Sequence, residues 1–437
     1  MTNSIDSLKI KSGRLLETIH ETAKWGAKGV WGPESTQTGV CRLALSDLDK
    51  EVRDWFVQET EKLGCQVKID EMGNIFAIYP GKNQGPPIGI GSHLDTQPNG
   101  GRYDGILGVL SGLEVLRTLK DNNYIPNYPI AVIDWTNEEG ARFPTSMVSS
   151  GVWAGKISLE NAWSLKSLDI NPVTMKHELE RIGYQGEVEA SYLENPLACH
   201  FELHIEQGPV LENEKKKIGV VTGVQAFEWN LVTITGKSSH AGTTPMNTRS
   251  DALMIASKII LMAIETASQQ GGLATVGTLD LEPRSVNVIP NIVKFSLDVR
   301  HVKDDNLEKI MKEIKTKATE IAQTNINSPF AKPLTVEFEN LITSPAINFN
   351  QTNIDTVRNS ALQLFKENEI RDIVSGAGHD SCFTSSRVPT SMIFIPSKNG
   401  VSHTPEEYSS PEEVENGFQV LLRSVLLYDE MRGNGSV

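Results

Sequence analysis

The residues most able to do chemistry lie in one short segment, GSHLDTQPNGGRYDG at 91–105. It holds His93, Asp95 and Asp104, which accept hydrogen bonds or bind metal ions. A polar loop whose acids face water would have the same composition. The alternative is that His93 and Asp104 converge on a metal ion. The glycines that would let the backbone bend at such a site are Gly100, Gly101 and Gly105. The segment alone does not decide between the two.

A second acidic cluster, TNEEG at 136–140, directly follows the apolar PIAVIDW at 129–135. Adjacent residues on a strand point to opposite faces, but a turn past its end can aim Glu138 and Glu139 at one cavity. A solvated loop is the alternative. In a metal site one carboxylate would bind the ion while the other carries protons. Both are needed, because a carboxylate committed to a cation is a poor base.

Two histidines complete a candidate ligand set. Apolar and polar residues alternate in HFELHIE (200–206), which predicts a strand with His204 on its polar face. His403 follows the apolar SMIFIP in a loop. A lone histidine is usually a satisfied polar residue, but a full set without cysteine suits two divalent ions bridged by one carboxylate, such as zinc, cobalt, manganese or nickel. The set is His93, Asp104, Glu139, His204 and His403, with Glu138 left unligated.

The surrounding pattern indicates elements that would bring these residues together. Residues 104–119 have apolar side chains at helical spacing, between the strand-like IGIGSHLDT (88–96) and PIAVIDW. Strand, helix and strand suggest a crossover unit and a parallel sheet. Ligands bind beyond the carboxyl ends of such strands, where His93 and the Glu138–Glu139 pair would both lie. This shared location favours a metal site over solvated loops.

The middle of the chain has a different pattern. We expect strands at 227–235, near 273–281, at 292–300 and at 333–340, and helices at 250–264 and 305–322. The order βαββαβ is the ferredoxin-like pattern of a complete small domain. Chemistry-bearing segments return after it, in SGAGHDS (375–381) and IPSKNGVSHTPEEY (395–408). We therefore predict an α/β catalytic domain made of residues 1–224 and 343–437, with an inserted domain at 225–342.

Composition limits the class of protein. A chain of 437 residues needs more than one core, and its net charge of −14 argues against nucleic acid as a partner. The first residues lack the apolar core of a signal peptide, and no apolar run approaches the roughly 20 residues that span a bilayer. The cysteines are far apart and form no CxxC pair: Cys41, Cys65, Cys199 and Cys382. We expect a cytoplasmic enzyme without a disulfide framework, away from membranes.

Over nearly its whole length the chain resembles the dinuclear-zinc amidohydrolases of the M20 peptidase type, and within them the N-carbamoyl-amino-acid hydrolases. The motifs are GSHLDT, GGRYDG, TNEEGARF, FELHIEQGPVLE, GKSSHAGTTPM, NVIPNIVKFSLDVR, GAGHD and GVSHTPEEY. TQPNGGRYDGILGVL and WTNEEGARFPTSM are most similar to the fungal β-alanine synthases (β-ureidopropionases). The resemblance implies a mixed-sheet, dinuclear-zinc exopeptidase-like catalytic domain. It also implies that the inserted ferredoxin-like domain serves as a lid and forms a homodimer.

The resemblance also implies roles at the metal site. Asp104 would bridge two divalent ions per subunit, with zinc the expected metal. The remaining ligands would be His93 and His204 on one ion, and Glu139 and His403 on the other. Glu138 would be the general base. Asp95 would orient His93 from behind the metal, which a metal-bound imidazole generally requires.

Substrate contacts follow from the same resemblance. His240, in GKSSHAG, would reach from the inserted domain of a partner subunit to the carbonyl under attack, and Asn287 and Arg300 would come from that domain too. In IVKFSLDVR the apolar residues alternate, so Arg300 joins the polar face and offers a bidentate clamp for a carboxylate. A surface arginine at a strand end is the alternative. The residues expected to line the pocket are Gln207, His379 and Gly400.

The reaction implied is hydrolysis of N-carbamoyl-β-alanine to β-alanine, ammonia and carbon dioxide, the last step of reductive pyrimidine degradation. An N-carbamoyl-L-α-amino acid hydrolase or an allantoate amidohydrolase on the same scaffold is the alternative. Asn287 and Arg300 fit this carbamoylase pattern rather than that of a dipeptidase. A metal-free binding protein on this fold belongs to another class, and a metal analysis separates the two.

Overall fold

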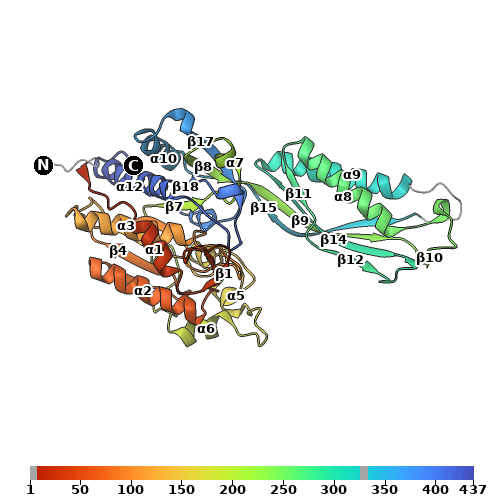
Figure 1. Cartoon of the computed structure of the whole chain (residues 1–437), viewed down its shortest axis with the longest axis horizontal. Coiled ribbons are helices and arrows are strands. Elements are labelled where there is room, and N and C mark those ends of the chain that lie inside the picture. The colour runs from red at the N-terminus through yellow and green to blue at the C-terminus, as the bar shows by residue number, and fades with distance from the viewer. Residues whose placement is uncertain (1–6, 325–332) are drawn as a thin grey trace. The chain divides into compact units, whose positions relative to one another are not determined.

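The structure is a computed structural model that describes residues 7–324 and 333–437. The first six residues of the N-terminal stretch, for which no signal peptide is expected, lie outside the described residues. The chain forms two compact units (Figure 1): unit 1 contains residues 1–223 and 349–437, and unit 2 contains residues 224–348. The sequence placed the second boundary at 342, but strand β15 (Thr335–Ser344) continues beyond that residue.

Unit 1 is built on a mixed sheet whose strands follow the order β8-β18-β7-β5-β6-β4-β3, with β17 beside β8. A separate two-stranded ladder joins β1 to β2. The strands are β1 (Ala27–Val30), β2 (Thr38–Val40), β3 (Gln66–Ile69), β4 (Ile75–Tyr79), β5 (Ile88–Ser92), β6 (Ile130–Asp134), β7 (Cys199–Ile205), β8 (Ile218–Val224), β17 (Ile370–Ser375) and β18 (Thr390–Ile395). The helices are α1 (Arg14–Thr22), α2 (Asp47–Leu63), α3 (Ile106–Asp121), α4 (Val148–Trp153), α5 (Leu159–Ser164), α6 (Met175–Ile182), α7 (Val210–Asn213), α10 (Gln351–Leu362), α11 (Ser381–Thr384) and α12 (Pro411–Gly433).

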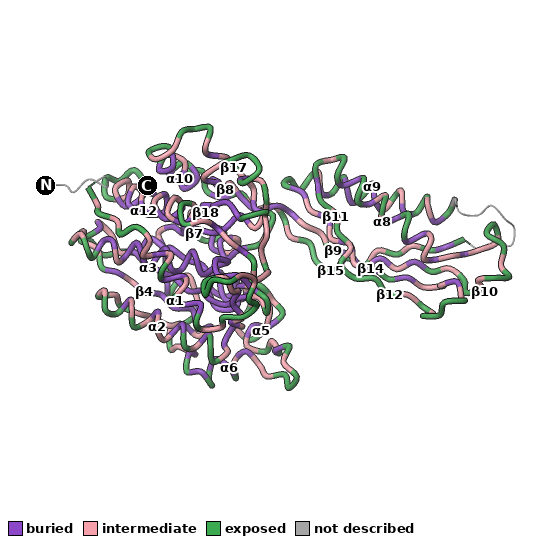
Figure 2. Tube along the Cα trace, viewed as in Figure 1, coloured by how far each residue is buried: buried purple, intermediate pink, exposed green. Residues whose placement is uncertain are grey.

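The four central strands, β18, β7, β5 and β6, are parallel, as the crossover pattern predicted. Each is buried along its whole length (Figure 2), because helices such as α3 and α12 pack against them. For β7 this corrects the sequence-based expectation. Its apolar and polar residues do alternate, but Glu202 and His204 are as buried as Phe201, because β7 lies between two parallel neighbours. The polar row of β7 therefore faces the interior.

A buried arginine joins α2 to the carboxyl end of β6. Arg53 Nε donates to Asp49 Oδ2 at 2.8 Å, and its terminal nitrogens donate to the Gly73 carbonyl and to Thr136 Oγ1. One of them also lies 3.3 Å from Asp134 Oδ2. Burial opposes the charge of the guanidinium, but Asp134 and Asp49 outweigh it and raise the pKa of Arg53 above its usual value. The network therefore anchors the turn that follows β6.

We expect the substitution Arg53→Met to destabilise the protein by about 3–5 kcal/mol, because it leaves two buried carboxylates without their cation. The measurement is the free energy of unfolding in a chemical denaturation series. Lys50→Met on the same helix is the matched control. It removes a partly exposed ion pair with Asp54 and should cost about 0.5 kcal/mol or less. Equal, small effects of the two substitutions would contradict the proposed role of Arg53.

Unit 2 has the predicted βαββαβ order. Its sheet runs β11-β14-β9-β15 with β12 beside β14, and all these neighbours are antiparallel. The strand expected near 273–281 is two short strands, β11 and β12. The elements are β9 (Ala226–Thr235), β10 (Ser239–His240), β11 (Leu273–Thr275), β12 (Leu279–Glu282), β13 (Val288–Ile289), β14 (Ile292–His301), β15, β16 (Ile347–Asn348), α8 (Ala252–Gln269) and α9 (Asp304–Thr324). The ends of unit 2 adjoin each other, because Phe227 pairs with Ser344.

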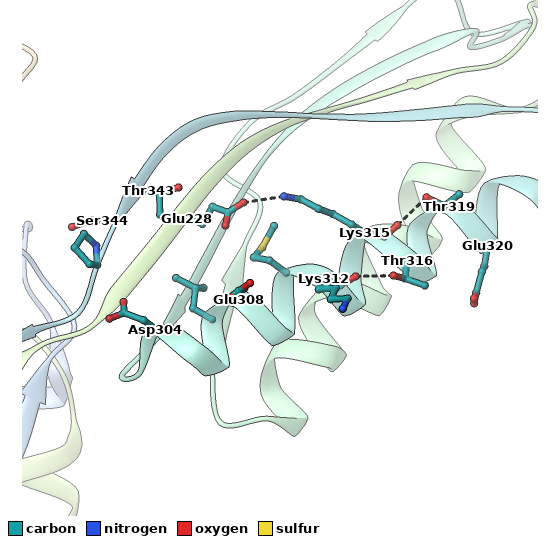
Figure 3. A pocket seen from close by; sticks show the side chains of 13 residues that line it. Glu228, Asp304, Glu308, Lys312, Lys315, Thr316, Thr319, Glu320, Thr343 and Ser344 are labelled. Atoms are coloured by element: carbon teal, nitrogen blue, oxygen red, sulfur yellow. Dashed lines mark hydrogen bonds and ion pairs between the residues drawn. The ribbon is translucent and has the colours of Figure 1, made fainter.

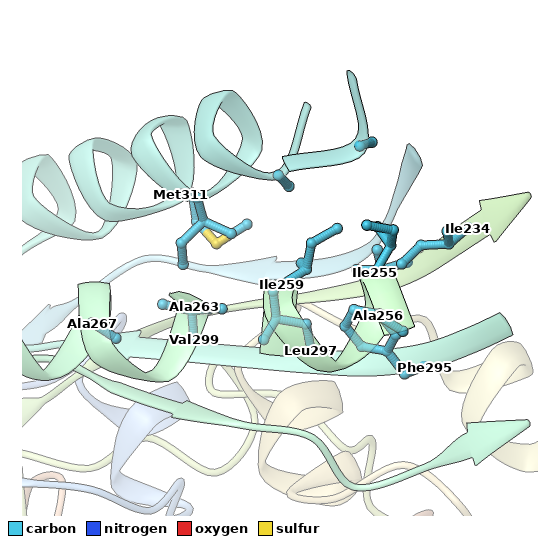
Figure 4. Close-up of a cluster of buried hydrophobic side chains, with 14 of the residues drawn as sticks. Ile234, Ile255, Ala256, Ile259, Ala263, Ala267, Phe295, Leu297, Val299 and Met311 are labelled. Atoms are coloured by element: carbon cyan, nitrogen blue, oxygen red, sulfur yellow. The ribbon is translucent and has the colours of Figure 1, made fainter. Parts of the chain in front are cut away.

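The core of unit 2 lies between its sheet and the two helices α8 and α9 (Figure 4). Ile255, Ile259 and Ala263 of α8 face Phe295 and Leu297 of β14, and all are almost completely buried. Within the described ranges 7–324 and 333–437, α8 is long and apolar enough to cross a membrane by length and composition alone. Only 39% of this helix is buried. Ile255, Ile259 and Ala263 pack into the core, whereas Leu261 and Ile264 on the same helix are exposed.

Candidate metal centre

The predicted ligands meet at the carboxyl ends of the parallel strands in unit 1. His93 follows β5 directly, and His204 is the second-last residue of β7. Glu139 lies in the turn after β6, and His403 in the loop after β18. Asp104 lies just before α3, the helix that crosses over between β5 and β6. Four segments that are far apart in the sequence therefore supply one cluster, as expected for this edge of a parallel sheet.

The carboxylate of Asp104 lies at the centre of this cluster and its two oxygens face different partners. Oδ1 is 3.1 Å from His204 Nε2 and 3.6 Å from His93 Nε2. Oδ2 is 3.2 Å from His403 Nε2, which is itself 3.5 Å from Glu139 Oε2. Among the described residues, potential ligand atoms form three groups: one consists of Glu202, His204 and His379, and the other two share Asp104. The two that share Asp104 are the groups that the resemblance assigned to two ions.

The orientation of the histidines fits a cation. His93 Nδ1 lies 2.9 Å from the Asp95 carbonyl oxygen, and His204 Nδ1 lies 2.8 Å from the Ile205 carbonyl oxygen. A carbonyl only accepts hydrogen bonds, so Nδ1 of each ring donates and Nε2 of the neutral ring presents a lone pair toward Asp104. Lone pairs and a carboxylate oxygen facing one another need a cation between them, and fixing the tautomer in this way is usual for metal-bound histidine.

Protons would compete with metal ions for the histidine Nε2 atoms. A hydrogen bond to Asp104 raises the pKa of His403 to about 9. Burial lowers the pKa of His204, but its hydrogen bond to Asp104 outweighs this and raises the value to about 9. For His93 burial dominates and lowers the pKa to about 4. Binding of divalent ions would therefore displace protons from His204 and His403.

The two adjacent glutamates point to different members of the cluster. Asn137, which precedes them, has φ 59°, a left-handed turn that rotates the chain past the end of β6. Glu138 Oε2 lies 3.5 Å from His93 Nε2, whereas Glu139 lies beside His403 and accepts from the backbone and side chain of Gln97. Burial, with Asp380 nearby, raises the pKa of Glu138 well above its usual value. Glu138 can thus take up protons without being a ligand.

Asp95 contacts His93 through its backbone rather than its side chain. Its carbonyl oxygen accepts from Nδ1, while its carboxylate is 3.9 Å away from that atom. The carboxylate accepts instead from the backbone N–H of Glu138 at 3.2 Å. Asp95 therefore links the orientation of His93 to the position of Glu138.

The expected pocket residues of unit 1 have different surroundings. Gln207 Nε2 donates to Asp104 Oδ2 at 2.8 Å and lies 3.3 Å from His403 Nε2. His379 is buried, its ring centroid is 4.6 Å from that of His204, and burial lowers its pKa well below the usual value. Gly400 has φ 65° and packs against the backbone of the segment that follows Gln207. Gln207 and His379 therefore contact members of the cluster, and Gly400 supports its edge.

The glycines of the first segment have distinct functions, which corrects the expectation that all three bend the backbone. Only Gly105 has a left-handed φ, 67°, and a Cβ there would lie 2.2 Å from the His93 ring. Gly100 and Gly101 have no such conformation. A Cβ on Gly101 would lie 2.1 Å from Glu407 Oε1. Gly101 is glycine because Glu407 approaches its backbone closely. Gly105 is glycine because the His93 ring approaches it closely and because its φ is left-handed.

Three contacting residues were not identified from the sequence. Gln97 donates twice to Glu139, and Ser402 Oγ lies 3.2 Å from Asp104 Oδ2. Glu407 accepts from the backbone N–H groups of Tyr103 and Asp104. The only available signal was their position beside predicted ligands in polar loops, which many solvated residues share.

The other predicted substrate residues lie in unit 2. His240 pairs with Val288 in the β10–β13 ladder, next to Asn287, and its Nδ1 accepts from the N–H groups of Gly242 and Thr243. Its ring proton is therefore on Nε2. Arg300 is on the polar face of β14, where the predicted alternation is confirmed. Its guanidinium is held by Asp298 at 2.7 Å and stacks on Phe227.

Unit 2 also contains a groove of about 960 Å³ between α9 and strands β9 and β15 (Figure 3). Leu307 and Met311 contribute apolar surface, and Lys315 crosses it to pair with Glu228 at 3.1 Å. Its lining residues belong to none of the three potential metal-binding groups found among residues 7–324 and 333–437. The groove therefore supplies none of these potential ligands.

Known proteins share this architecture. An N-carbamoyl-L-amino-acid amidohydrolase of Rhizobium meliloti is 38% identical over 424 residues, 96% of this chain and 97% of that protein. A ureidoglycolate hydrolase of Oryza sativa subsp. japonica is 34% identical, over 89% of this chain and 80% of its own. The crystal structure of an amidase of the hydantoinase/carbamoylase family from Burkholderia multivorans matches with a TM-score of 0.88 and 42% sequence identity. The match covers 96% of this chain and 98% of that chain.

These similarities define the class as hydrolases that act on amide bonds. The model of peptidase family M20/M25/M40 matches residues 89–427, and the chain belongs to this family. The predicted M20-type amidohydrolase and its α/β fold are thereby confirmed. The finer resemblance to fungal β-alanine synthases is not reflected in the names of these three relatives.

Proposed function

We propose that the protein hydrolyses N-carbamoyl-L-α-amino acids to the free amino acid, ammonia and carbon dioxide. The observation that carries the proposal is the division of the Asp104 oxygens between two ligand groups beside the unligated Glu138. The similarity to the N-carbamoyl-L-amino-acid amidohydrolase of Rhizobium meliloti over 96% of the chain supports the substrate class. It favours α-amino acids over the N-carbamoyl-β-alanine expected from the sequence.

Two divalent ions fit the donor set. His93 and His204 with Asp104 would hold one, and His403 and Glu139 with the same Asp104 would hold the other. Nitrogen and oxygen ligands without thiolate suit zinc, and also manganese, cobalt or nickel. When bound, such ions polarise the ureido carbonyl, a poor electrophile because two nitrogens donate into it, and lower the pKa of water.

Glu138 would act as the general base. It takes a proton from the attacking water and returns it to the departing nitrogen. The water oxygen adds to the ureido carbon, and the bond from that carbon to the amino-acid nitrogen breaks. The products are the amino acid and carbamic acid, which decomposes to ammonia and carbon dioxide.

Residues of unit 2 would bind the substrate. His240 carries its proton on Nε2 and so can donate to the developing oxyanion, a contribution of roughly 3 kcal/mol for one such donor. Arg300 offers a fork for the substrate carboxylate. Asn287 immediately precedes the neighbouring strand β13, and its carbonyl accepts from the N–H of Ala241, next to His240.

The separation of these residues within unit 2 supports a homodimer. Arg300 pairs with Phe227 at the start of β9, and Ile292 pairs with Thr235 at its end. Eight residues of strand correspond to about 26 Å, and His240 follows the Thr235 end. That distance is far longer than the separation of a ureido carbonyl and a carboxylate in one substrate molecule, where only a few bonds lie between them. If both residues contact one substrate, they come from different chains, as the sequence resemblance implied.

The surface of unit 2 has apolar side chains that such a dimer would cover. Leu261 and Ile264 on α8 are 63% and 41% exposed, and Leu279 on the edge strand β12 is 44% exposed. Burial of exposed apolar surface is a main driving force of subunit association. We propose that the homodimer forms through this part of unit 2.

We also propose a cytoplasmic location. All four cysteines are unpaired in the structure, which suits a reducing compartment. The net charge of −14 supports a small-molecule substrate rather than nucleic acid.

Substitutions of the two glutamates should have different effects on metal content and turnover. Glu139→Gln removes a ligand and should lower metal content below the two ions per chain expected for the wild type. Glu138→Gln should retain both ions and lose turnover by about 10²–10⁴-fold, as is typical for loss of a general base. Elemental analysis and steady-state kinetics on the same preparations measure both effects. Near-normal turnover by Glu138→Gln would exclude it as the base, and fully active metal-free protein would exclude the mechanism.

The dimer can be tested by complementation. Asp104→Ala and His240→Ala chains should each be inactive, but mixed under conditions of subunit exchange they should recover activity. Each mixed dimer would contain one site with both defects and one with neither. Random pairing of equal amounts then gives about a quarter of the wild-type activity. If exchange is demonstrated with labelled chains and no activity returns, His240 does not act across subunits.

Substrate choice is tested by comparing kcat/KM for a panel of ureido compounds. We expect a higher kcat/KM for N-carbamoyl-L-α-amino acids than for N-carbamoyl-β-alanine. The two kinds of substrate differ in the distance between the ureido group and the carboxylate. Ureidoglycolate belongs in the panel because of the Oryza sativa relative, and allantoate because the sequence resemblance left an allantoate amidohydrolase open. A preference for N-carbamoyl-β-alanine would restore the substrate expected from the sequence. A preference for allantoate or ureidoglycolate would indicate an allantoate amidohydrolase or a ureidoglycolate hydrolase instead.

A further inference from the structure

Glu407 connects the two loops that carry Asp104 and His403. Its side chain is buried, and the residue is 2% exposed. Oε1 accepts the backbone N–H groups of Tyr103 and Asp104, each at 3.0 Å, although these residues are more than 300 positions away in the sequence. Oε2 accepts from Ser402 Oγ at 2.8 Å. Three donors from two loops therefore converge on one carboxylate.

Ser402 extends this connection to the Asp104 side chain. Its hydroxyl oxygen lies 2.8 Å from Glu407 Oε2 and 3.2 Å from Asp104 Oδ2. Gln207 Nε2 donates to the same Asp104 oxygen at 2.8 Å and to Ser402 Oγ at 3.1 Å. The oxygen held in this way is the one that faces His403. Ser402 has one hydroxyl proton and donates it to Glu407, so Glu407 constrains the backbone of Asp104 directly and its carboxylate through Ser402 and Gln207.

The chain leaves space for this carboxylate. A Cβ at Gly101 would lie 2.1 Å from Glu407 Oε1 and 2.3 Å from its carboxyl carbon. Gly101 has no left-handed φ, so conformation does not require glycine at this position. Glycine is required there because the Glu407 carboxylate lies so close to the backbone of this residue. The adjacent Glu406 is exposed and makes no hydrogen bond or ion pair that the structure records.

We propose that Glu407 is a positioning residue of the metal centre. It fixes the Asp104 loop and the His403 loop relative to each other, so that one oxygen of Asp104 faces each ligand group. Its bonds go to backbone N–H groups and to a hydroxyl, so it acts through Asp104 and not on the substrate. The proposal rests on the proposed dinuclear site and adds a residue outside its five ligands.

The test compares Glu407→Ala with the neighbouring Glu406→Ala as control. Both proteins are stripped of metal and titrated with Mn²⁺, with free ion and electron paramagnetic resonance measured at each step. Glu407→Ala should weaken the binding of the second Mn²⁺ by about 10- to 100-fold, the range for loss of a residue that supports metal ligands. It should also lose the exchange-coupled spectrum of a bridged ion pair. Glu406→Ala should match the wild type in both.

Two further variants distinguish positioning from a general loss of folding. Glu407→Gln keeps an oxygen that can accept both backbone N–H groups, so it should restore most of the coupled signal. Gly101→Ala places a methyl group against the carboxylate from the opposite loop and should reproduce the Glu407→Ala defect. This variant serves as the test if Glu407→Ala does not fold.

The outcomes separate the two proposals. Wild-type affinity for the second ion and a coupled spectrum in folded Glu407→Ala, or in Gly101→Ala, would overturn the positioning role while leaving the enzyme mechanism intact. Wild-type protein that binds no Mn²⁺ and no Zn²⁺ would overturn the dinuclear site and Glu407's role together. Loss of the coupled signal in Glu407→Ala and Gly101→Ala, but not in Glu407→Gln or Glu406→Ala, supports the proposal.

Discussion

One buried carboxylate, that of Asp104, determines how the rest of the first unit must be built. Its oxygens face His204 and His93 on one side and His403 on the other. An anion with so little solvent is costly to bury unless cations lie beside it. Everything that fixes its orientation therefore also fixes where cations can bind. This explains why Gln207, Ser402 and three histidines surround a single side chain.

The strands determine where the candidate ligand residues lie, and the loops determine where their side chains point. Parallel β5, β6, β7 and β18 bring four segments to one edge of the sheet, but the side chains must then turn toward a common centre. Asn137, Gln207 and His403 all have left-handed φ near 58°, a conformation that is unfavourable for residues other than glycine. Buried hydrogen bonds, such as those of Asn137 to the carbonyls of Phe143 and Thr145, hold one of these turns in place.

The sequence predicted the cluster of histidines and carboxylates that the structure brings together, because these residues lie at strand ends, where chemistry and topology agree. It also predicted the order of elements in unit 2, since local periodicity determines them. It did not predict Glu407 or Arg53, because their partners are distant in sequence and contacts of that kind leave no local pattern. The burial of Glu202 and His204 was missed for a similar reason. Alternation shows that a strand has two faces, but neighbouring strands and helices determine which face meets water.

The way unit 2 is attached has a consequence for how such an enzyme can change. The unit begins and ends on paired neighbouring strands, with Phe227 opposite Ser344. On the unit 1 side, the Phe349 N–H donates to the Thr222 carbonyl at 3.0 Å. Entry and exit of the insertion are therefore one hydrogen bond apart, and a short linker would close the chain there without moving a strand of unit 1. The candidate metal ligands all lie in unit 1, so exchanging the insertion at this one place would leave all of them in the chain.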